Sequence, residues 1–487
     1  MYRMRTIVLL CSLIAASWAA AMPQPSGSAG AYAYPTPPSF GKCVASYTDG
    51  SFFVAGSVGG CGGTDFFVQR HDVPLTQTRW SNVYDATCMD NVPRGAATFG
   101  DIAYVAGGVT GGQYLARIGA DGSRVWTVVP NMTYVCDVAV ASDDGSIWVV
   151  GYDSGPPMSA VVIQYRDNGS GVTQLGRNAY RFQDSYDTQA FAVAVAADAA
   201  YIGGAVLAAS IPSPWVMAVN RTGGVVRFSQ RTTDTVSRSW IARLVAGQGR
   251  VFGLHLRDNG SGLPLSGRVA AIDTSNGTYS ESADVFNGMG MTTFSDFPCG
   301  IAMHPTLPIL ITGGVGTIRV HNFGLEGLWS VGDVSAGGTG PVVGGVAISN
   351  RLDYTVAVAY TTGFAATEIA HLDGYAFTQD LTQVAGTSNL VAAPNLMDLA
   401  EAGSFIRFIV KPLKATKETK IEVFDRAGNL FWSKVVALEG AGNTEYVWDG
   451  FSVAKRRIGP GGYVAILTGS GSNSSDRAPF VVTGKSK

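Results

Sequence analysis

The stretch CDVAVASDDGSIWVVG, residues 136–151, contains two short apolar runs separated by a turn, and this pattern decides the fold. The first run alternates valine with small residues, and the second carries Trp148 and ends on Gly151. Valine, isoleucine and tryptophan favour strands over helices. Asp144-Gly145 between the runs is a signal for a tight hairpin turn. The stretch therefore predicts two antiparallel strands joined by a hairpin.

The same arrangement recurs along the chain at intervals of 41 to 59 residues. Seven first strands can be recognised, and they begin at Cys43, Gly95, Cys136, Phe191, Trp240, Cys299 and Gly344. Each is followed by a second strand, a third strand and a turn, and a fourth strand sometimes carries tryptophan, as at Trp126. Four short antiparallel strands in a unit of roughly 45 residues are typical of a propeller blade. The repeat predicts a seven-bladed β-propeller over residues 41–382.

The repeat also fits the geometry of a ring. First strands lie nearest the axis, where small residues such as alanine and glycine fit, and a single blade cannot bury both of its faces alone. Ala31 to Tyr34 could supply a strand that closes the last blade, and residues 22–40 could equally be a linker rich in Pro, Gly and Ser. The units resemble the propeller repeats of bacterial secreted and cell-surface proteins, which occur in proteins of many functions.

Composition shifts after Leu381, where Lys and Glu become frequent, and residues 383–392 are expected to form a linker. Six or seven short strands are then expected over residues 393–487, among them Phe405 to Val410 and Tyr463 to Leu467. That density of strands is typical of a small β-sandwich. We therefore expect an all-β chain, with a seven-bladed β-propeller followed by a small Ig-like β-sandwich.

Three motifs in this C-terminal part combine hairpin turns with a core tryptophan and a glycine-rich approach to a strand. Their residues are Asp425, Gly428, Trp448, Asp449, Gly450, Gly462 and Tyr463. Together the motifs resemble the Ig-like domain of the flagellar hook-capping protein family. Ala393-Pro394-Asn395 also resembles the first residues of the sorting domains of type IX secretion. Either resemblance implies export, assembly or anchoring rather than catalysis.

The first residues predict a secretory signal peptide over residues 1–21. Arg3 and Arg5 precede an apolar run of about a dozen residues, and Ala19 to Ala21 give a small-residue cleavage pattern. The run is too short for a spanning helix, and no later stretch is long and apolar enough to cross a bilayer. We therefore expect an exported protein that is secreted, periplasmic or held at the cell surface.

The balance of charges narrows the expected partners. Charged residues make up 14% of the chain, and its formal net charge is −2. Nucleic-acid binding needs a basic face, and electrostatic attachment to a membrane needs a polybasic segment. The sequence therefore argues against both and leaves a protein or glycan at the cell surface as the expected partner.

Five cysteines remain once the signal peptide is set aside, and in an exported protein they are expected to be oxidised where geometry allows. The register of the repeat places all five at one rim of the ring. It predicts that Cys43 pairs with Cys61 and that Cys88 pairs with Cys136, which leaves Cys299 as a free thiol. The alternative is that some of these residues are unpaired buried thiols.

No catalytic or metal-binding motif is found in the sequence. It has no His-x-x-x-His, His-Glu-x-x-His, Cys-x-x-Cys or Gly-x-Ser-x-Gly pattern, so we predict no catalytic residues, no metal and no cofactor. An acid pair for glycoside cleavage cannot be assigned from spacing, because that geometry depends on the fold. The leading hypothesis is an exported non-enzymatic binding or structural protein, whose sandwich serves attachment or assembly. The alternative is a propeller enzyme acting at the channel mouth, such as a lactonase, a glycosidase or a quinone-dependent dehydrogenase.

Overall fold

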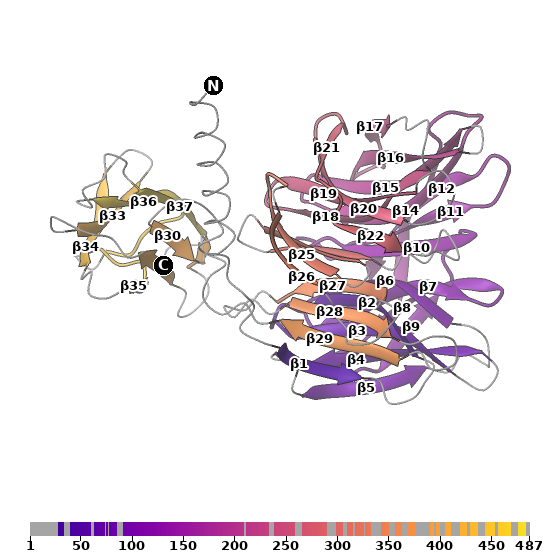
Figure 1. Cartoon of the computed structure of the whole chain (residues 1–487), viewed down its shortest axis with the longest axis horizontal. Coiled ribbons are helices and arrows are strands. Elements are labelled where there is room, and N and C mark those ends of the chain that lie inside the picture. Colours follow the sequence, from indigo (N-terminus) through magenta and orange to yellow (C-terminus); the bar gives the residue numbers. More distant parts are fainter. Residues whose placement is uncertain are drawn as a thin grey trace, which may run out of the picture. The chain divides into compact units, whose positions relative to one another are not determined.

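A computed structural model of the chain describes residues 28–33, 39–59, 63–73, 75, 77–84, 91–208, 211–232, 238–258, 265–289, 299–304, 309–314, 317–325, 327–332, 342–349, 356–362, 369–375, 390–393, 396–399, 405–410, 419–425, 429–436, 444–452, 456–468 and 476–483. Within these ranges every named element is a β-strand (Figure 1). None of the described segments is a helix of the length and apolarity needed to cross a bilayer. The predicted all-β fold is confirmed.

Two compact units divide the chain, Met1–Gln379 and Asp380–Lys487. The first unit contains seven antiparallel sheets, which we call blades 1 to 7. The strands of blades 1 and 2 are β2 (Ser39–Ser46), β3 (Phe52–Gly59), β4 (Thr64–His71), β5 (Thr78–Tyr84), β6 (Asn91–Phe99), β7 (Ile102–Val109), β8 (Gly112–Ile118) and β9 (Arg124–Val128). Those of blades 3 and 4 are β10 (Tyr134–Val140), β11 (Ile147–Asp153), β12 (Ser159–Asp167), β13 (Val172–Tyr180), β14 (Asp187–Val195), β15 (Ala199–Ala208), β16 (Ile211–Asn220) and β17 (Val226–Arg231).

The remaining three blades complete the set. Blade 5 has β18 (Ser239–Gly247), β19 (Arg250–Arg257), β20 (Leu265–Ile272) and β21 (Tyr279–Glu281), with β22 (Phe286–Met289) also paired to β20. Blade 6 has β23 (Gly300–Met303), β24 (Ile309–Gly314), β25 (Thr317–Asn322) and β26 (Gly327–Gly332). Blade 7 has β27 (Val342–Ile348), β28 (Val356–Thr362), β29 (Ile369–Tyr375) and the N-terminal strand β1 (Ser28–Ala33).

The first strands of the blades form a closed inner ring. Each of β2, β6, β10, β14, β18, β23 and β27 packs against the next, and β27 packs against β2. Blade 7 joins the two ends of the unit, because β1 pairs antiparallel with β29 and places Ala33 opposite His371. The seven sheets are therefore the blades of a β-propeller, as the repeat predicts.

A β-bulge marks the same point of nearly every inner strand. The register with the second strand shifts once, between Gly41 and Cys43, Pro93 and Gly95, Val135 and Asp137, Ala190 and Ala192, Ile241 and Arg243, and Val343 and Gly345. The neighbouring inner strand passes very close at this level: a Cβ on Gly344 would lie 2.1 Å from the carbonyl oxygen of Gly41. Small residues recur in the repeat because the inner strands nearly touch here. We call the side of the ring nearer the bulges the bulge side, and the opposite side, where inner strands end in turns, the turn side.

The outermost strand of a blade docks on a turn of the next blade. Trp80 Nε1 on β5 donates to the carbonyl of Ala120 at 2.8 Å, and Asn82 Nδ2 donates to that of Gly122 at 2.9 Å. The same docking joins blades 3 and 4, where the Tyr180 hydroxyl donates to the carbonyl of Gly224 at 2.8 Å. These bonds link residues about one repeat apart, so they orient blade 1 against blade 2 and blade 3 against blade 4.

Gly122 and Gly169 provide a test of this docking, since both are turn glycines with left-handed φ of 80° and 86°. A Cβ on Gly122 would meet Asn82 at 2.5 Å and Trp80 at 2.7 Å, whereas one on Gly169 meets nothing within 4 Å. Gly169→Ala should cost about 1–2 kcal/mol from the backbone alone. Gly122→Ala should cost a further ~1–3 kcal/mol, because Trp80 and Asn82 must move. Urea unfolding followed by circular dichroism measures both, and equal losses would show that the docking contributes nothing.

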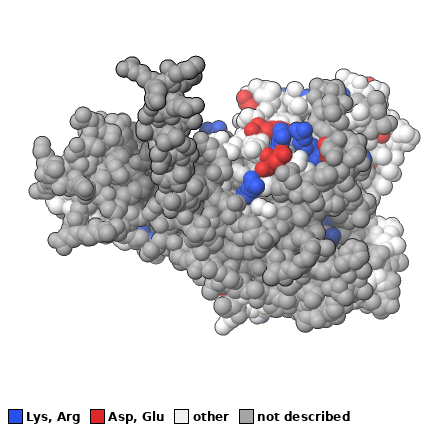
Figure 2. All heavy atoms as spheres, in the orientation of Figure 1, with Lys and Arg blue, Asp and Glu red and all other residues white. Residues whose placement is uncertain are grey.

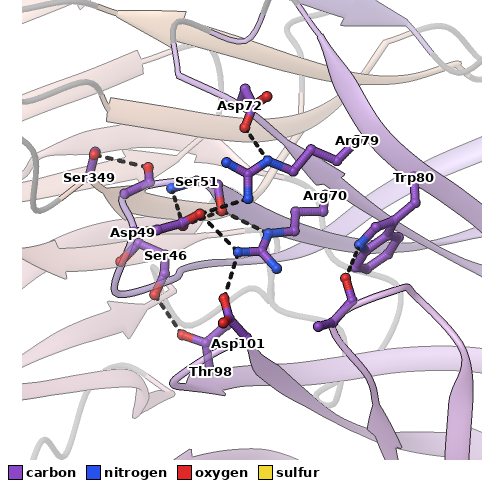
Figure 3. A network of polar contacts seen from close by, with 12 residues as sticks. Ser46, Asp49, Ser51, Arg70, Asp72, Arg79, Trp80, Thr98, Asp101 and Ser349 are labelled. Atoms are coloured by element: carbon purple, nitrogen blue, oxygen red, sulfur yellow. Dashed lines mark hydrogen bonds and ion pairs between the residues drawn. The ribbon is translucent and has the colours of Figure 1, made fainter.

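A polar network on the turn side ties blades 7, 1 and 2 together (Figure 3). Arg70 on β4 is 3% exposed and donates to Asp49 at 3.0 Å and to Asp101 of blade 2 at 2.9 Å. The Ser349 hydroxyl of blade 7 donates to the carbonyl of Gly50 at 3.0 Å. Burial alone would raise the pKa of Asp49. Hydrogen bonds from Ser51 and Arg79 outweigh that effect and hold this pKa well below its ordinary value. The stability that this carboxylate contributes is therefore present at neutral pH and lost as pH falls into the acid range.

Arg70 and Arg79 both contact Asp49 but differ in burial, so they form a matched pair. Arg79→Met should cost less than about 1 kcal/mol, because its side chain is 40% exposed. Arg70→Met should cost about 1.5–3 kcal/mol, because it removes the hydrogen bonds that a buried guanidinium makes to the two carboxylates. Thermal unfolding of the two variants at pH 7 gives the comparison. Similar losses of stability in the two variants would mean that the buried contacts of Arg70 do not hold blades 1 and 2 together.

The second unit is a sandwich of two sheets. A three-stranded sheet contains β30 (Leu390–Ala393), β32 (Ile406–Val410) and β35 (Thr444–Trp448). A five-stranded sheet contains β31 (Leu396–Asp398), β37 (Asp476–Thr483), β36 (Gly461–Thr468), β33 (Thr419–Asp425) and β34 (Leu430–Val436). Phe408, Trp448 and Phe480 are buried in the core between the sheets. This is the small β-sandwich that the strand density predicts.

Candidate functional site

A cavity of about 300 Å³ lies at the centre of the propeller and is lined by residues from all seven inner strands. Its charged lining residues are Lys42, Arg94, Asp137 and Arg243, which lie at or beside bulges. Towards the turn side the lining is mostly alanine and valine, as in 138–140 and 193–195. The charged groups of this central cavity are thus gathered at one end, while the valine side chains of 138–140 and 193–195 pack between blades.

Arg243 reaches towards the axis of the ring. One of its guanidinium nitrogens donates to the carbonyl of Ala242 at 3.2 Å. Its charge also interacts with Cys299 beside β23, with Asp137 on β10 and with the cysteines at the bulges of β2 and β10. Burial alone would lower the pKa of Arg243, but these groups raise it. These groups belong to three different blades and Arg243 to a fourth, and Arg243 is among the residues that line the central cavity.

Asp137 is the one acidic residue among the described residues that line the central cavity. Its Oδ1 accepts a hydrogen bond from the Val138 amide at 2.9 Å, and its Oδ2 accepts one from the Val193 amide of the next blade at 3.1 Å. Burial raises the pKa of Asp137 to about 6, against the opposing effects of Arg243 and the two amides. Glycoside cleavage requires two carboxyl groups about 5–10 Å apart, and the described lining supplies one.

Arg94 lies at the bulge of β6, where it borders both the central cavity and a larger groove. Its Nη1 donates to the Gln113 side chain and to the Val135 carbonyl, each at 3.3 Å. The guanidinium carbon lies 4.4 Å from the ring centre of Tyr134, and that ring stacks on Tyr152 at 5.1 Å. Neutral acceptors and an aromatic face therefore hold this positive charge.

The larger groove has a volume of about 970 Å³ and lies between blades 2 and 3 on the bulge side. Its walls are the 109–112 turn between β7 and β8 and the 129–133 connection between β9 and β10. Arg177 pairs with Asp153 inside it and donates to the carbonyl of Asn131 at 2.7 Å. We call this the rim groove. Its size is that of small-molecule and peptide sites, and its polar groups converge from two blades.

The described histidines do not meet in the central cavity or the rim groove. Burial lowers the pKa of His71 to about 4, of His304 to about 3 and of His321 to about 4, so all three are neutral at pH 7. His255 contacts Glu281 in blade 5. Across the described ranges, no three His, Cys, Asp or Glu side chains form a group that could hold a metal ion.

Charges on the surface of the propeller unit are mixed rather than of one sign. Figure 2 shows basic and acidic side chains next to one another over the blade that contains β18 to β21. Ion pairs in this blade join Arg268 to Glu281 and to Asp284. The described part of this face therefore offers no extended basic surface for a polyanion.

Three of the predicted site cysteines are described and buried, namely Cys43, Cys136 and Cys299. Cys43 lines the central cavity, and all three interact electrostatically with Arg243. Cys61 and Cys88 lie outside the described residues, so the pairings Cys43–Cys61 and Cys88–Cys136 remain predictions.

The motif residues of the sandwich take structural positions. Trp448 is 2% exposed and its Nε1 donates to the carbonyl of Phe451 at 2.8 Å, while Asp449 accepts the Phe451 amide at 3.2 Å. Asp425 accepts the Asn429 amide at 2.9 Å, and Gly428 lies outside the described residues. Gly450 has a φ of 82°, and Gly462 and Tyr463 are the second and third residues of β36. In this unit the motifs form turns and core rather than a site.

The motifs and spacing of the sequence did not identify the charged residues of the central cavity as site residues. Asp137 and Arg243 sit in first strands, at the position directly after the bulge where other blades have Gly95, Ala192 or Gly345. A charged residue among small ones at an equivalent repeat position is a detectable signal. It requires the repeats to be aligned on the bulge rather than on the apparent start of each strand.

Burial raises the pKa of the Cys299 thiol to about 11, although Arg243 opposes the shift. In native protein at pH 8, iodoacetamide should therefore label Cys299 on the order of 100-fold more slowly than in urea-unfolded protein. Peptide mapping by mass spectrometry measures the rate, and a non-reduced map of the same sample tests both predicted disulfides. Rapid native labelling of Cys299 would contradict the buried position.

No protein-family model and no curated protein matches the sequence. Among solved structures, the chain is similar to PorZ, described as an essential bacterial surface component of the type-IX secretion system of Porphyromonas gingivalis. The two share 12% sequence identity at a TM-score of 0.41, over 90% of this chain. The chain spans about 59% of the length of that protein.

Proposed function

We propose that this is an exported binding protein without enzymatic activity, whose propeller holds a ligand in the rim groove and whose sandwich serves attachment or assembly. The rim groove carries the proposal, because it is the largest of the cavities described above and collects polar groups from blades 2 and 3. Asp153, Arg177 and Asn131 are fixed by mutual bonds, so the groove is preorganised for a ligand. The predicted signal peptide supports export and a partner at the cell surface.

The sandwich supports the attachment role through its open edges. Within the described residues, β34 and β35 are the last strands of their sheets. Both expose apolar side chains, with Leu430 at 54%, Val435 at 50% and Val447 at 63%. An exposed edge strand with apolar side chains is a ready template for pairing with another chain. The likeness of its motifs to the hook-capping Ig-like domain points the same way.

The rim groove can be tested with substitutions that neutralise both members of its ion pair. The paired substitutions Asp153→Asn and Arg177→Gln should weaken binding of the full-length protein to the surface of the producing cells at least 10-fold. Asp143→Asn with Arg221→Gln is the matched control, because that pair lies in a pocket on the turn side. Flow cytometry with labelled protein measures both affinities. Equal binding by the two double variants would remove the rim groove from the proposal, and Val447→Lys tests the sandwich in the same assay.

A further inference from the structure

Gln113, in the wall of the rim groove, has an amide nitrogen with no acceptor. The side chain is 9% exposed, and its Oε1 accepts the Val135 amide at 2.9 Å and Arg94 Nη1 at 3.3 Å. Both partners are donors, so the oxygen of the Gln113 amide must face them and its Nε2 must face away. Gln113 lines the rim groove and is not among the described residues that line the central cavity. The groove is therefore where Nε2 can meet a ligand.

Arg94 supplies a second donor beside the first. Its Nη1 is shared between Gln113 and the carbonyl of Val135, and it forms no ion pair with a carboxylate of the described residues. Gly108 leaves space for the guanidinium, since a Cβ there would lie 2.4 Å from Nη1. Within the described part of the chain, Arg94 Nη2 and Gln113 Nε2 have no partner, and neither is sealed from solvent. Two adjacent donors, one of them charged, match the two oxygens of a carboxylate.

The rest of the groove is neutral. Asp153 and Arg177 compensate each other, and Arg177 also holds the main-chain carbonyl of Asn131. The Asn131 side chain is exposed and forms no hydrogen bond among the described residues, so its amide can still donate and accept. Val129 is 75% exposed, which makes it the most exposed apolar residue of the described lining. A ligand therefore meets one cation, one free amide and one apolar side chain.

A peptide fits these groups better than a sugar does. Tyr134 is the one aromatic residue among the described lining, and its ring already contacts Arg94 and Tyr152. The groove therefore offers no uncommitted aromatic ring on which a sugar could stack. The 109–112 turn is open at Gly111, where a Cβ would meet nothing within 4 Å, so a peptide backbone can approach it. The volume of about 970 Å³ suits several residues rather than one small carboxylate.

Resting on the proposed function of the rim groove, we infer that its ligand is a peptide that ends there, with its terminal carboxylate bound by Arg94 and Gln113. The main chain of the peptide bonds the Asn131 amide, and its last side chain packs on Val129. A carboxyl terminus is favoured over an acidic side chain, because it brings the main chain itself between the two walls. Capture of a terminal carboxylate is a recurring mode of peptide recognition.

The test is a pentapeptide library that lacks Asp and Glu, prepared once with free carboxyl termini and once with carboxamide termini. The full-length protein at pH 7.5 should retain the free acids about 10-fold better than the amides, which cannot form charge-assisted bonds. Affinity selection followed by mass spectrometry measures retention. Equal retention of the two libraries, or retention of neither, would overturn the inference. Retention of a hyaluronan tetrasaccharide in place of the peptides would overturn it in favour of an acidic glycan.

Variants locate the carboxylate. Gln113→Glu exchanges the free donor for an anionic acceptor of nearly the same shape, and it should weaken the best-retained free acid about 10-fold or more. Gln164→Glu is the matched control, because Gln164 lines the pocket on the turn side, and its affinity should stay within about 2-fold of wild type. Asn131→Ala changes an exposed side chain and should cost about 3-fold, which keeps the test valid if Gln113→Glu fails to fold. Fluorescence anisotropy measures each affinity, and unchanged binding in Gln113→Glu and Asn131→Ala would contradict the site.

The failure of this inference differs from the failure of the proposed function. Loss of cell binding in the Asp153→Asn and Arg177→Gln double variant, with neither library retained by the wild type, would reject the carboxyl-terminal ligand alone. Retention of free acids that Gln113→Glu weakens, with cell binding by the double variant equal to that of its control, would uphold the peptide site and reject the role of the groove at the cell surface.

Discussion

The close approach of seven inner strands around one axis is the constraint on which the propeller depends. At the bulges the strands pass so near that a Cβ on Gly344 would lie 2.1 Å from Gly41 and one on Gly300 would lie 2.6 Å from Val346. Overlap of this size cannot be relieved by rotating a side chain, because the opposing atoms are backbone. Close approach therefore favours small residues at such points, and the alanine- and glycine-rich repeat reflects that preference.

Closure at the centre leaves the outer strands to be fixed by other means. A blade widens away from the axis, so contacts between neighbours become sparser and more specific at the rim. Here the outermost strands reach across to turn carbonyls, as Trp80 does to Ala120 and Tyr180 does to Gly224. Arg70 adds a buried ionic link between blades 1 and 2. The strand β1 closes blade 7 by pairing with β29, so the circle is completed by hydrogen bonds between residues from the two ends of the unit.

Sequence periodicity was sufficient for the architecture because each blade repeats the same hairpin pattern. Six of the seven first strands inferred from the repeat begin at the bulged residue or within two residues of it, with Cys136 and Phe191 at the bulge itself and Trp240 two residues before it. The residues of the candidate sites could not be predicted from this periodicity. Arg94, Asp137 and Arg243 are far apart in sequence and share no motif, and only the closed ring brings them to one cavity. The rim groove likewise depends on how two blades pack.

The inner-strand residues that are not small at the bulges therefore need a separate explanation. At the level of the bulges a small residue satisfies the packing constraint at least cost, and Gly95, Ala192 and Gly345 conform to it. Asp137 and Arg243 place ionisable groups in the same crowded layer, where desolvation opposes charge. Asp137 recovers part of that cost by accepting amides from Val138 and Val193, which also joins blade 3 to blade 4. Arg243 interacts with Asp137 of blade 3 and with Cys299 beside β23 of blade 6, so its charge also links groups that belong to different blades.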